Sequence, residues 1–198
     1  MRLIDLAKND QTLANADALK EAAVNEMMSR FEKNNKAAFM EQFNKENPLP
    51  ATATDAQRLE HQAKANEAWQ ALLSEQRKGY EDIANDVIKT LSHDIPHSFI
   101  KKDEFAQQFA SKALDFDKER YSQIFNQGEA AFTQKNGDIR TYSNAVSRAV
   151  SKVPSGKIYD HRSVNRDYLA QSIAYARTAQ QKDAYIQSQL DNGVTRES

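Results

Sequence analysis

The sequence predicts an all-α protein of five to seven helices, arranged as a somewhat elongated helical bundle with an N-terminal helical arm. Apolar residues recur every three or four positions along most of the chain, which is the period of one helical face. The 198 residues include only 5 Gly and 4 Pro, and no stretch is typical of β-strands. Alanine is present in 28 copies, so we expect helices that approach one another closely around a thin core.

An amphipathic helix, or a pair of them, is predicted to begin near Asn15 and to end before Asn47. Its apolar face repeats every fourth residue, at Leu19, Ala23, Met27 and Phe31. Two prolines follow within residues 48–53, and proline cannot continue a helix because it lacks the backbone donor. We therefore predict a linker there, which divides the chain into an N-terminal helical arm (1–47) and a helical body (55–198).

A second long helix is predicted after this linker. Thr54 or Asp55 can cap it, because a short side-chain oxygen accepts hydrogen bonds from the free amides of the first turn. The helical period then runs from Leu59 almost to Ser92. Gly79 interrupts it at a cost of about 1 kcal/mol relative to alanine, which predicts a bend or a break between two helices.

Two shorter helices are predicted between a turn at residues 92–97 and a turn at 136–138. The apolar stripe of the first is Phe105, Phe109 and Ala113, and that of the second is Tyr121, Ile124, Phe125 and Phe132. A further helix over 139–153 is stopped by Pro154, and a final helix covers about 163–191.

The charge of the chain is spread unevenly. Up to Asp138 there are 18 basic and 23 acidic residues. Residues 139–182 hold 8 basic and only 2 acidic residues, a net charge of +6 within a chain whose total is −1. An acidic body joined to a basic C-terminal segment indicates that charge helps to select the binding partners of the chain.

The basic C-terminal helices are therefore the predicted binding region. Arg148 and Lys152 are four residues apart and share a helical face, and Arg162 and Arg166 repeat that spacing. The full predicted set is Arg140, Arg148, Lys152, Lys157, Arg162, Arg166, Tyr168 and Tyr175. Hydroxyls and an amide that can also donate to an anion accompany it, at Ser143, Asn144, Ser147 and Ser151.

These residues lead to a first hypothesis, a non-catalytic intracellular binding protein whose helices over about 139–182 dock on an acidic protein partner. The alternative is a DNA- or RNA-associated protein, in which the same cations hold phosphates and Tyr168 and Tyr175 stack on bases. The competing interpretation is that the basic helices neutralise the acidic body within the fold and that the tyrosines belong to the core.

A phosphate-handling enzyme is the third hypothesis. Asp160, His161 and Arg162 form the densest polar group in the sequence, and a histidine held by a carboxylate can act as a general base. Asp160 also fits the N-cap of a helix, which needs no catalysis. We therefore favour a protein that is not an enzyme.

Neither a metal nor a cofactor is predicted. The chain has no cysteine, which excludes disulfides, thiolate nucleophiles and cysteine-ligated metals, and agrees with a cytoplasmic protein. His93 and His97 have the spacing of two metal ligands on one helix, but Pro96 lies between them. The N-terminus does not resemble a signal peptide and no apolar run is long enough to span a membrane, so we expect no membrane association. The oligomeric state is left open.

Overall fold

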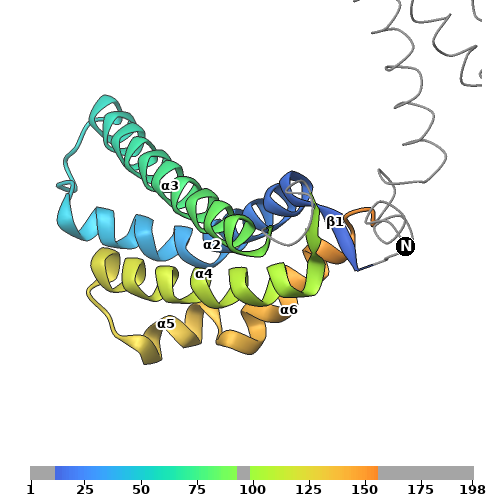
Figure 1. Cartoon of the computed structure of the whole chain (residues 1–198). Coiled ribbons are helices and arrows are strands. Elements are labelled where there is room, and N and C mark those ends of the chain that lie inside the picture. The colour runs from blue at the N-terminus through green and yellow to red at the C-terminus, as the bar shows by residue number, and fades with distance from the viewer. Residues whose placement is uncertain (1–11, 93–98, 156–198) are drawn as a thin grey trace, which may run out of the picture. The chain divides into compact units, whose positions relative to one another are not determined.

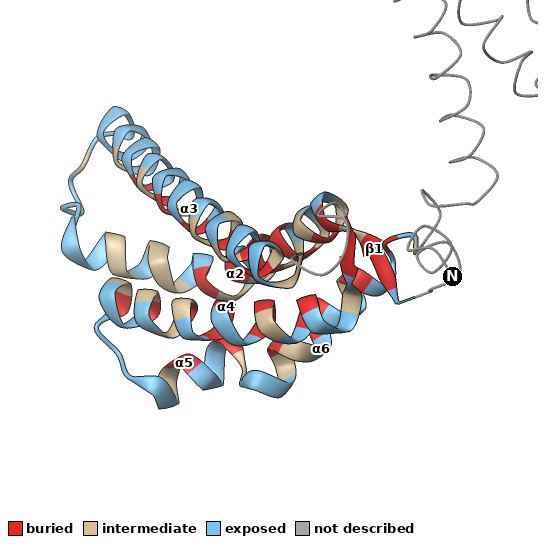
Figure 2. Ribbon diagram, in the orientation of Figure 1, coloured by how far each residue is buried: buried red, intermediate tan, exposed pale blue. Residues whose placement is uncertain are grey.

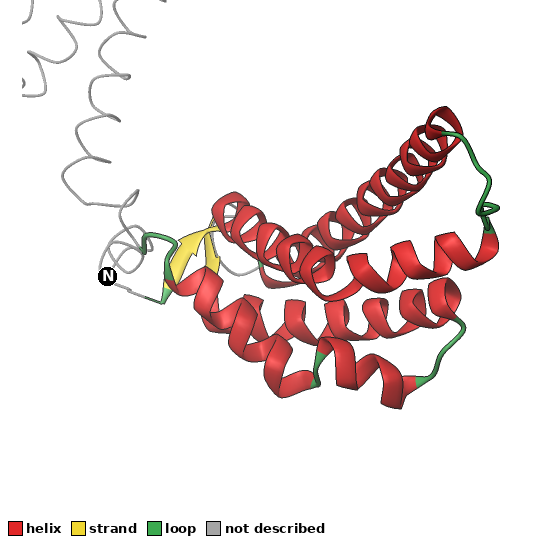
Figure 3. Cartoon of the chain, turned by 180° about the vertical axis from the view of Figure 1, so that it is seen from behind, coloured by secondary structure: helices red, strands yellow, loops and turns green. Residues whose placement is uncertain are grey.

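The computed structural model describes residues 12–92 and 99–155, which contain five helices and two short strands (Figure 1). In chain order the elements are β1 (Leu13–Asn15), α2 (Ala16–Glu46), α3 (Asp55–Leu91), β2 (Phe99–Lys101), α4 (Lys102–Phe125), α5 (Glu129–Asn136) and α6 (Ile139–Ser151). The predicted all-α class is confirmed, since helices make up most of the described residues (Figure 3).

The two long helices begin and end where local sequence signals place them. Asn15 caps α2 by accepting a hydrogen bond from the Ala18 amide at 3.0 Å, and the helix stops at Glu46, just before the proline-containing loop. Thr54 caps α3 through a reciprocal pair of hydrogen bonds with Gln57. Such a capping box satisfies two backbone donors at a terminus that little else covers.

The predicted break at Gly79 does not occur, because α3 is one continuous helix through this position. The alternative of a bend there stays a prediction. The glycine instead allows close packing against α4. A Cβ atom at Gly79 would overlap the Phe116 ring, at Cζ, Cε1 and Cε2. The missing side chain therefore makes room for an aromatic ring rather than ending the helix.

The predicted pair of shorter helices is also divided differently. Residues from Phe105 to Phe125 belong to the single helix α4, and only Phe132 belongs to the next helix, α5. The end of α4 is set by Asn126, whose φ of 52° is left-handed. Asparagine tolerates this conformation better than most residues, so it stops the helix there.

A small antiparallel sheet, which the sequence did not predict, lies at one end of the helices (Figure 3). β1 pairs with β2 in the register Leu13 with Lys101, Ala14 with Ile100 and Asn15 with Phe99. Ala14 also forms a bridge with Ser155, just beyond α6. Strands of three residues are too short to show an alternating pattern, yet this sheet joins the start of α2, the start of α4 and the end of α6.

The core lies where α2, α3, α4 and α6 face one another (Figure 2). Nine of the buried side chains in the described residues are alanines, as the composition predicts for closely spaced helices. A second cluster joins α2 to α3, with the ring of Trp69 stacked on Phe31 at 5.9 Å and tilted against Phe39 at 5.2 Å. By contrast, nearly all of residues 55–64 at the start of α3 are exposed.

The predicted boundary between arm and body falls in the exposed loop between α2 and α3. Thr12–Ser155 groups as one compact unit, and the buried face of α2 is part of its main core. The division into a helical arm (1–47) and a helical body therefore stays a prediction for proteolysis to test. The final predicted helix, over about 163–191, lies outside the described residues.

Candidate binding surface

A glycine and a capping aspartate form the turn before α6. Gly137 has a φ of 96°, a conformation that side chains with a Cβ rarely adopt. Asp138 then caps α6, because its carboxylate accepts hydrogen bonds from the Thr141 amide at 3.1 Å and from the Thr141 hydroxyl at 3.2 Å. The hydrogen bond from the Thr141 backbone amide is the main reason why the pKa of Asp138 is lowered.

α6 has two clearly different faces. Its inner face is buried and carries Tyr142, Ala145, Val146 and Val150. Its outer face, which we call the basic face, is exposed and carries Arg140, Asn144, Ser147, Arg148, Ser151 and Lys152. The spacing of three and four residues in each set places the two groups on opposite sides of the helix.

The cations of the basic face are not neutralised within the part of the fold that the structure describes. Arg140, Arg148 and Lys152 form no ion pair with any residue of 12–92 or 99–155. Ser151 donates its hydroxyl hydrogen to the Arg148 carbonyl at 2.7 Å, so this hydrogen is already used inside the helix. The basic face thus presents positive charge outward.

The carboxyl end of α6 is held by Lys102 from the first turn of α4. The Lys102 amine donates a hydrogen bond to the carbonyl of Val153, just beyond α6. A cation at this end also complements the partial negative charge of the helix terminus. Partial burial lowers the pKa of Lys102.

The inner face of α6 is anchored by a buried carboxylate on α4. The Tyr142 hydroxyl donates to Oδ2 of Asp117 at 2.6 Å. From α3, the Tyr80 hydroxyl donates to Oδ1 at 2.6 Å and the Gln76 amide donates to the same oxygen at 3.1 Å. Asp117 therefore joins three helices through three hydrogen bonds.

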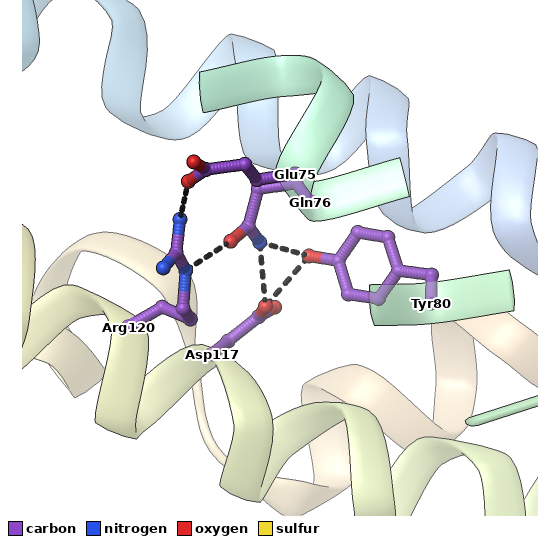
Figure 4. Close-up of polar contacts among 5 residues, drawn as sticks. All are labelled: Glu75, Gln76, Tyr80, Asp117 and Arg120. Carbon is purple, nitrogen blue, oxygen red and sulfur yellow. Dashed lines mark hydrogen bonds and ion pairs between the residues drawn. The ribbon is translucent and has the colours of Figure 1, made fainter. Parts of the chain in front are cut away.

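A second layer of polar contacts covers this anchor on one side (Figure 4). Nε of Arg120 donates to Oε1 of Gln76 at 3.0 Å, and an outer nitrogen of its guanidinium donates to Glu75 at 2.7 Å. The layer holds the Gln76 amide in the orientation in which its nitrogen faces Asp117. Arg120 thus positions the donor and leaves the carboxylate itself without a direct ion pair among the described residues.

The electrostatics of the anchor follow from its burial. Burial raises the pKa of Asp117 to about 6, although hydrogen bonds from Tyr142, Tyr80 and Gln76 act in the opposite direction. Burial, and then the Asp117 charge, raise the pKa of both Tyr80 and Tyr142, so both hydroxyls stay protonated donors. Asp117 is only 5% exposed, so its carboxylate is enclosed by the groups of α3 and α6 that donate to it.

The structure brings together three of the predicted binding residues, Arg140, Arg148 and Lys152, on the basic face. The others lie outside the described residues: Lys157, Arg162, Arg166, Tyr168 and Tyr175. The same is true of the hypothetical catalytic group Asp160, His161 and Arg162, and of His93 and His97. Within the described residues, no cluster of three or more potential metal ligands occurs.

The sequence did not lead us to Asp117, although a signal for it exists. It continues a series with a step of four: Phe105, Phe109, Ala113, Asp117, Tyr121 and Phe125. A polar residue in an apolar stripe predicts a buried hydrogen-bonded group. Dividing α4 into two short helices hid this position. Gln76 was likewise missed as a polar residue in the apolar stripe of α3.

Comparisons of the chain with protein families, with curated proteins and with solved structures found no match. Among the described residues, no helix is long and apolar enough to cross a membrane. The function therefore has to be argued from the α6 surface and from the composition of the chain.

Proposed function

We propose that this is a non-catalytic binding protein whose basic face of α6 docks on an acidic protein surface. The observation that carries the proposal is the exposure of Arg148 and Lys152, one helical turn apart and without an ion pair in the described residues. A segment that merely neutralised the acidic body would place these cations against carboxylates of that body. The cytoplasmic location predicted from the sequence stays part of the proposal.

The attachment of α6 supports the proposal as well. Tyr142 is tied to Asp117 and the remaining inner residues are packed in the core, so the basic face is presented by a helix of defined position. A surface that is ordered before binding loses less conformational entropy on association. Arginine adds a planar group of donors that matches a carboxylate with two parallel hydrogen bonds. Lys157, Arg162 and Arg166 extend the proposed surface on sequence grounds alone.

Nucleic acid is the second candidate, because Asn144 and Ser147 lie beside Arg148 and can donate to phosphate oxygens. Ser151 is not available for such a contact, since its hydroxyl already donates to the Arg148 carbonyl. A phosphate-handling enzyme built on Asp160, His161 and Arg162 remains a prediction from the sequence.

The test is the double reversal Arg148→Glu with Lys152→Glu in the full chain. Proteins recovered with the wild type from a cell extract are identified and purified, and each is then titrated against both forms. We expect the reversal to weaken binding at least tenfold, since both cations would become repulsive toward an acidic partner. The matched control is Lys33→Glu with Lys36→Glu, which makes the same change of net charge on the exposed side of α2.

Two further results separate the possible outcomes. In the double reversal, two acidic residues at the end of α6 oppose the helix dipole and could destabilise the helix. The neutral variant Arg148→Gln with Lys152→Gln avoids this, so comparing the two variants shows whether a loss of binding comes from unfolding. Nuclease release of the bound material, with log affinity falling linearly with log salt, would favour nucleic acid. Equal binding by the reversed and control variants would refute a role for the basic face.

A further inference from the structure

The two oxygens of the Asp117 carboxylate are held by different helices. Oδ1 accepts two hydrogen bonds, both from α3, through Tyr80 and Gln76. Oδ2 accepts a single hydrogen bond, from Tyr142 of α6. The side chain is buried, so the attachment of α6 covers a carboxylate that water would otherwise solvate.

The groups around this carboxylate do not include a cation in direct contact. α3 contributes the neutral groups Tyr80 and Gln76, together with Glu75, which is paired with Arg120 of α4. α6 contributes the neutral Tyr142, and Arg30 of α2 acts on Tyr142 only through its charge. Within residues 12–92 and 99–155, no lysine or arginine forms an ion pair with the Asp117 carboxylate.

We propose that Asp117 is a proton-dependent latch for α6, which holds the helix more tightly when the carboxyl is neutral and lets it open locally more often when the carboxyl is ionised. The proposal goes beyond partner binding and does not depend on it. Arg120 favours the ionised carboxylate only through its charge, because its hydrogen bonds go to Gln76 and Glu75. Burial outweighs this effect, so an ionised Asp117 favours any motion that admits water to it. α6 is the element expected to move, because it is shorter than α3 and α4 and contacts Asp117 through one hydrogen bond, from Tyr142 to Oδ2.

The direction of the pH dependence follows from the linkage between protonation of Asp117 and closure of α6. Burial raises the pKa of Asp117 from 3.8 to about 6 in the closed form, whereas solvation in an open form returns the pKa toward its ordinary value. The form with the higher pKa is favoured by protons. Closure is therefore strongest below the ordinary pKa and weakens as the pH rises through about 6.

The test is amide hydrogen exchange of the full chain at about pH 5 and about pH 7.5, corrected for intrinsic exchange rates. We expect the protection of the Ala145, Val146 and Val150 amides to fall by about tenfold at the higher pH, as linkage gives for a full return of the carboxyl to its ordinary pKa. Amides of Ala23 and Met27 in α2 serve as internal references and should change less.

Two variants on α4 identify the group responsible. Asp117→Asn is a permanently neutral isostere and should abolish the pH dependence in α6. Asp115→Asn removes an exposed carboxyl of the same helix and should leave the dependence intact. If Asp117→Asn does not fold, a carboxyl NMR titration of the wild type replaces it, and its midpoint must coincide with that of the exchange.

Three outcomes would overturn the latch. The first is protection of α6 that does not change with pH in the wild type. The second is a pH dependence that survives in Asp117→Asn. The third is an equal change in all helices, which would mean that the whole unit opens together. None of these outcomes bears on partner binding, so the latch and the proposed function succeed or fail separately.

Discussion

At the scale of single residues, buried amides specify how α5 meets α2. Asn35 and Asn136 are almost completely buried and form two reciprocal hydrogen bonds, at 2.9 and 3.2 Å. Each amide also donates to the backbone carbonyl four residues earlier in its own helix. With both donors and the acceptor of each side chain used, the pair is a satisfied polar contact in an otherwise apolar region.

Removing one amide of this pair should destabilise the fold by more than the loss of its hydrogen bonds alone. Asn35→Ala and Asn136→Ala should each lower the free energy of unfolding by about 2 kcal/mol, because the remaining amide is buried without its partner. The double variant should lose less than the two single losses together, by about 1 kcal/mol. Chemical denaturation of all four forms measures this coupling, with the exposed Asn44→Ala as a control. Strict additivity would contradict the reciprocal pair.

At the scale of elements, the contact between α3 and α4 depends on the absence of a side chain at Gly79. The Phe116 ring occupies the space that a Cβ would need, and it also meets the Tyr80 ring edge-on, with centroids 5.6 Å apart. Tyr80 in turn donates to Asp117. A glycine that lowers the stability of an isolated helix thus permits the packing that surrounds the anchor of α6.

Whether a substitution at Gly79 stabilises or destabilises the fold should depend on the Phe116 ring that faces it. In the wild type we expect Gly79→Ala to lower the free energy of unfolding by about 1 kcal/mol or more, because the displaced ring outweighs the gain in helix propensity. In a Phe116→Ala background, the same substitution should stabilise by about 1 kcal/mol, since only the propensity remains. Thermal melting of the four forms tests this. A stabilising effect in both backgrounds would show that the ring moves aside freely.

At the scale of the whole molecule, the described unit is closed by contacts between segments far apart in the sequence. The sheet ties β1 to β2, and its bridge to Ser155 brings the exit of α6 beside the entrance to α2. The face of α2 is buried against α3, α4 and α6. The loop between α2 and α3 and the first turns of α3 are mostly exposed.

Limited proteolysis should therefore cut first between Pro48 and Asp55, where the backbone is exposed and only locally bonded. Because α2 contributes to the core, we expect the two fragments to remain together on size-exclusion chromatography until denaturant is added. Separation of the fragments in native buffer would show that residues 1–47 are an independent arm. Early cleavage elsewhere, with this loop intact, would argue against the predicted linker.

Features that depend on neighbours within one or two turns could be read from the sequence. The proline-containing loop ends α2, Thr54 caps α3 and Pro154 follows α6, because capping and proline chemistry act over a few residues. The uneven charge likewise required only the order of the residues, and it led to Arg140, Arg148 and Lys152 before any placement was known.

What the tertiary structure alone decided is which distant groups meet. Gln76 and Tyr80, Asp117, and Tyr142 come from three helices, and no local pattern states that they share one carboxylate. The same holds for the two short strands and for the ring that fills the space at Gly79. Periodicity shows which side of a helix is buried, whereas the partners on that side depend on how helices pack across long separations in the chain.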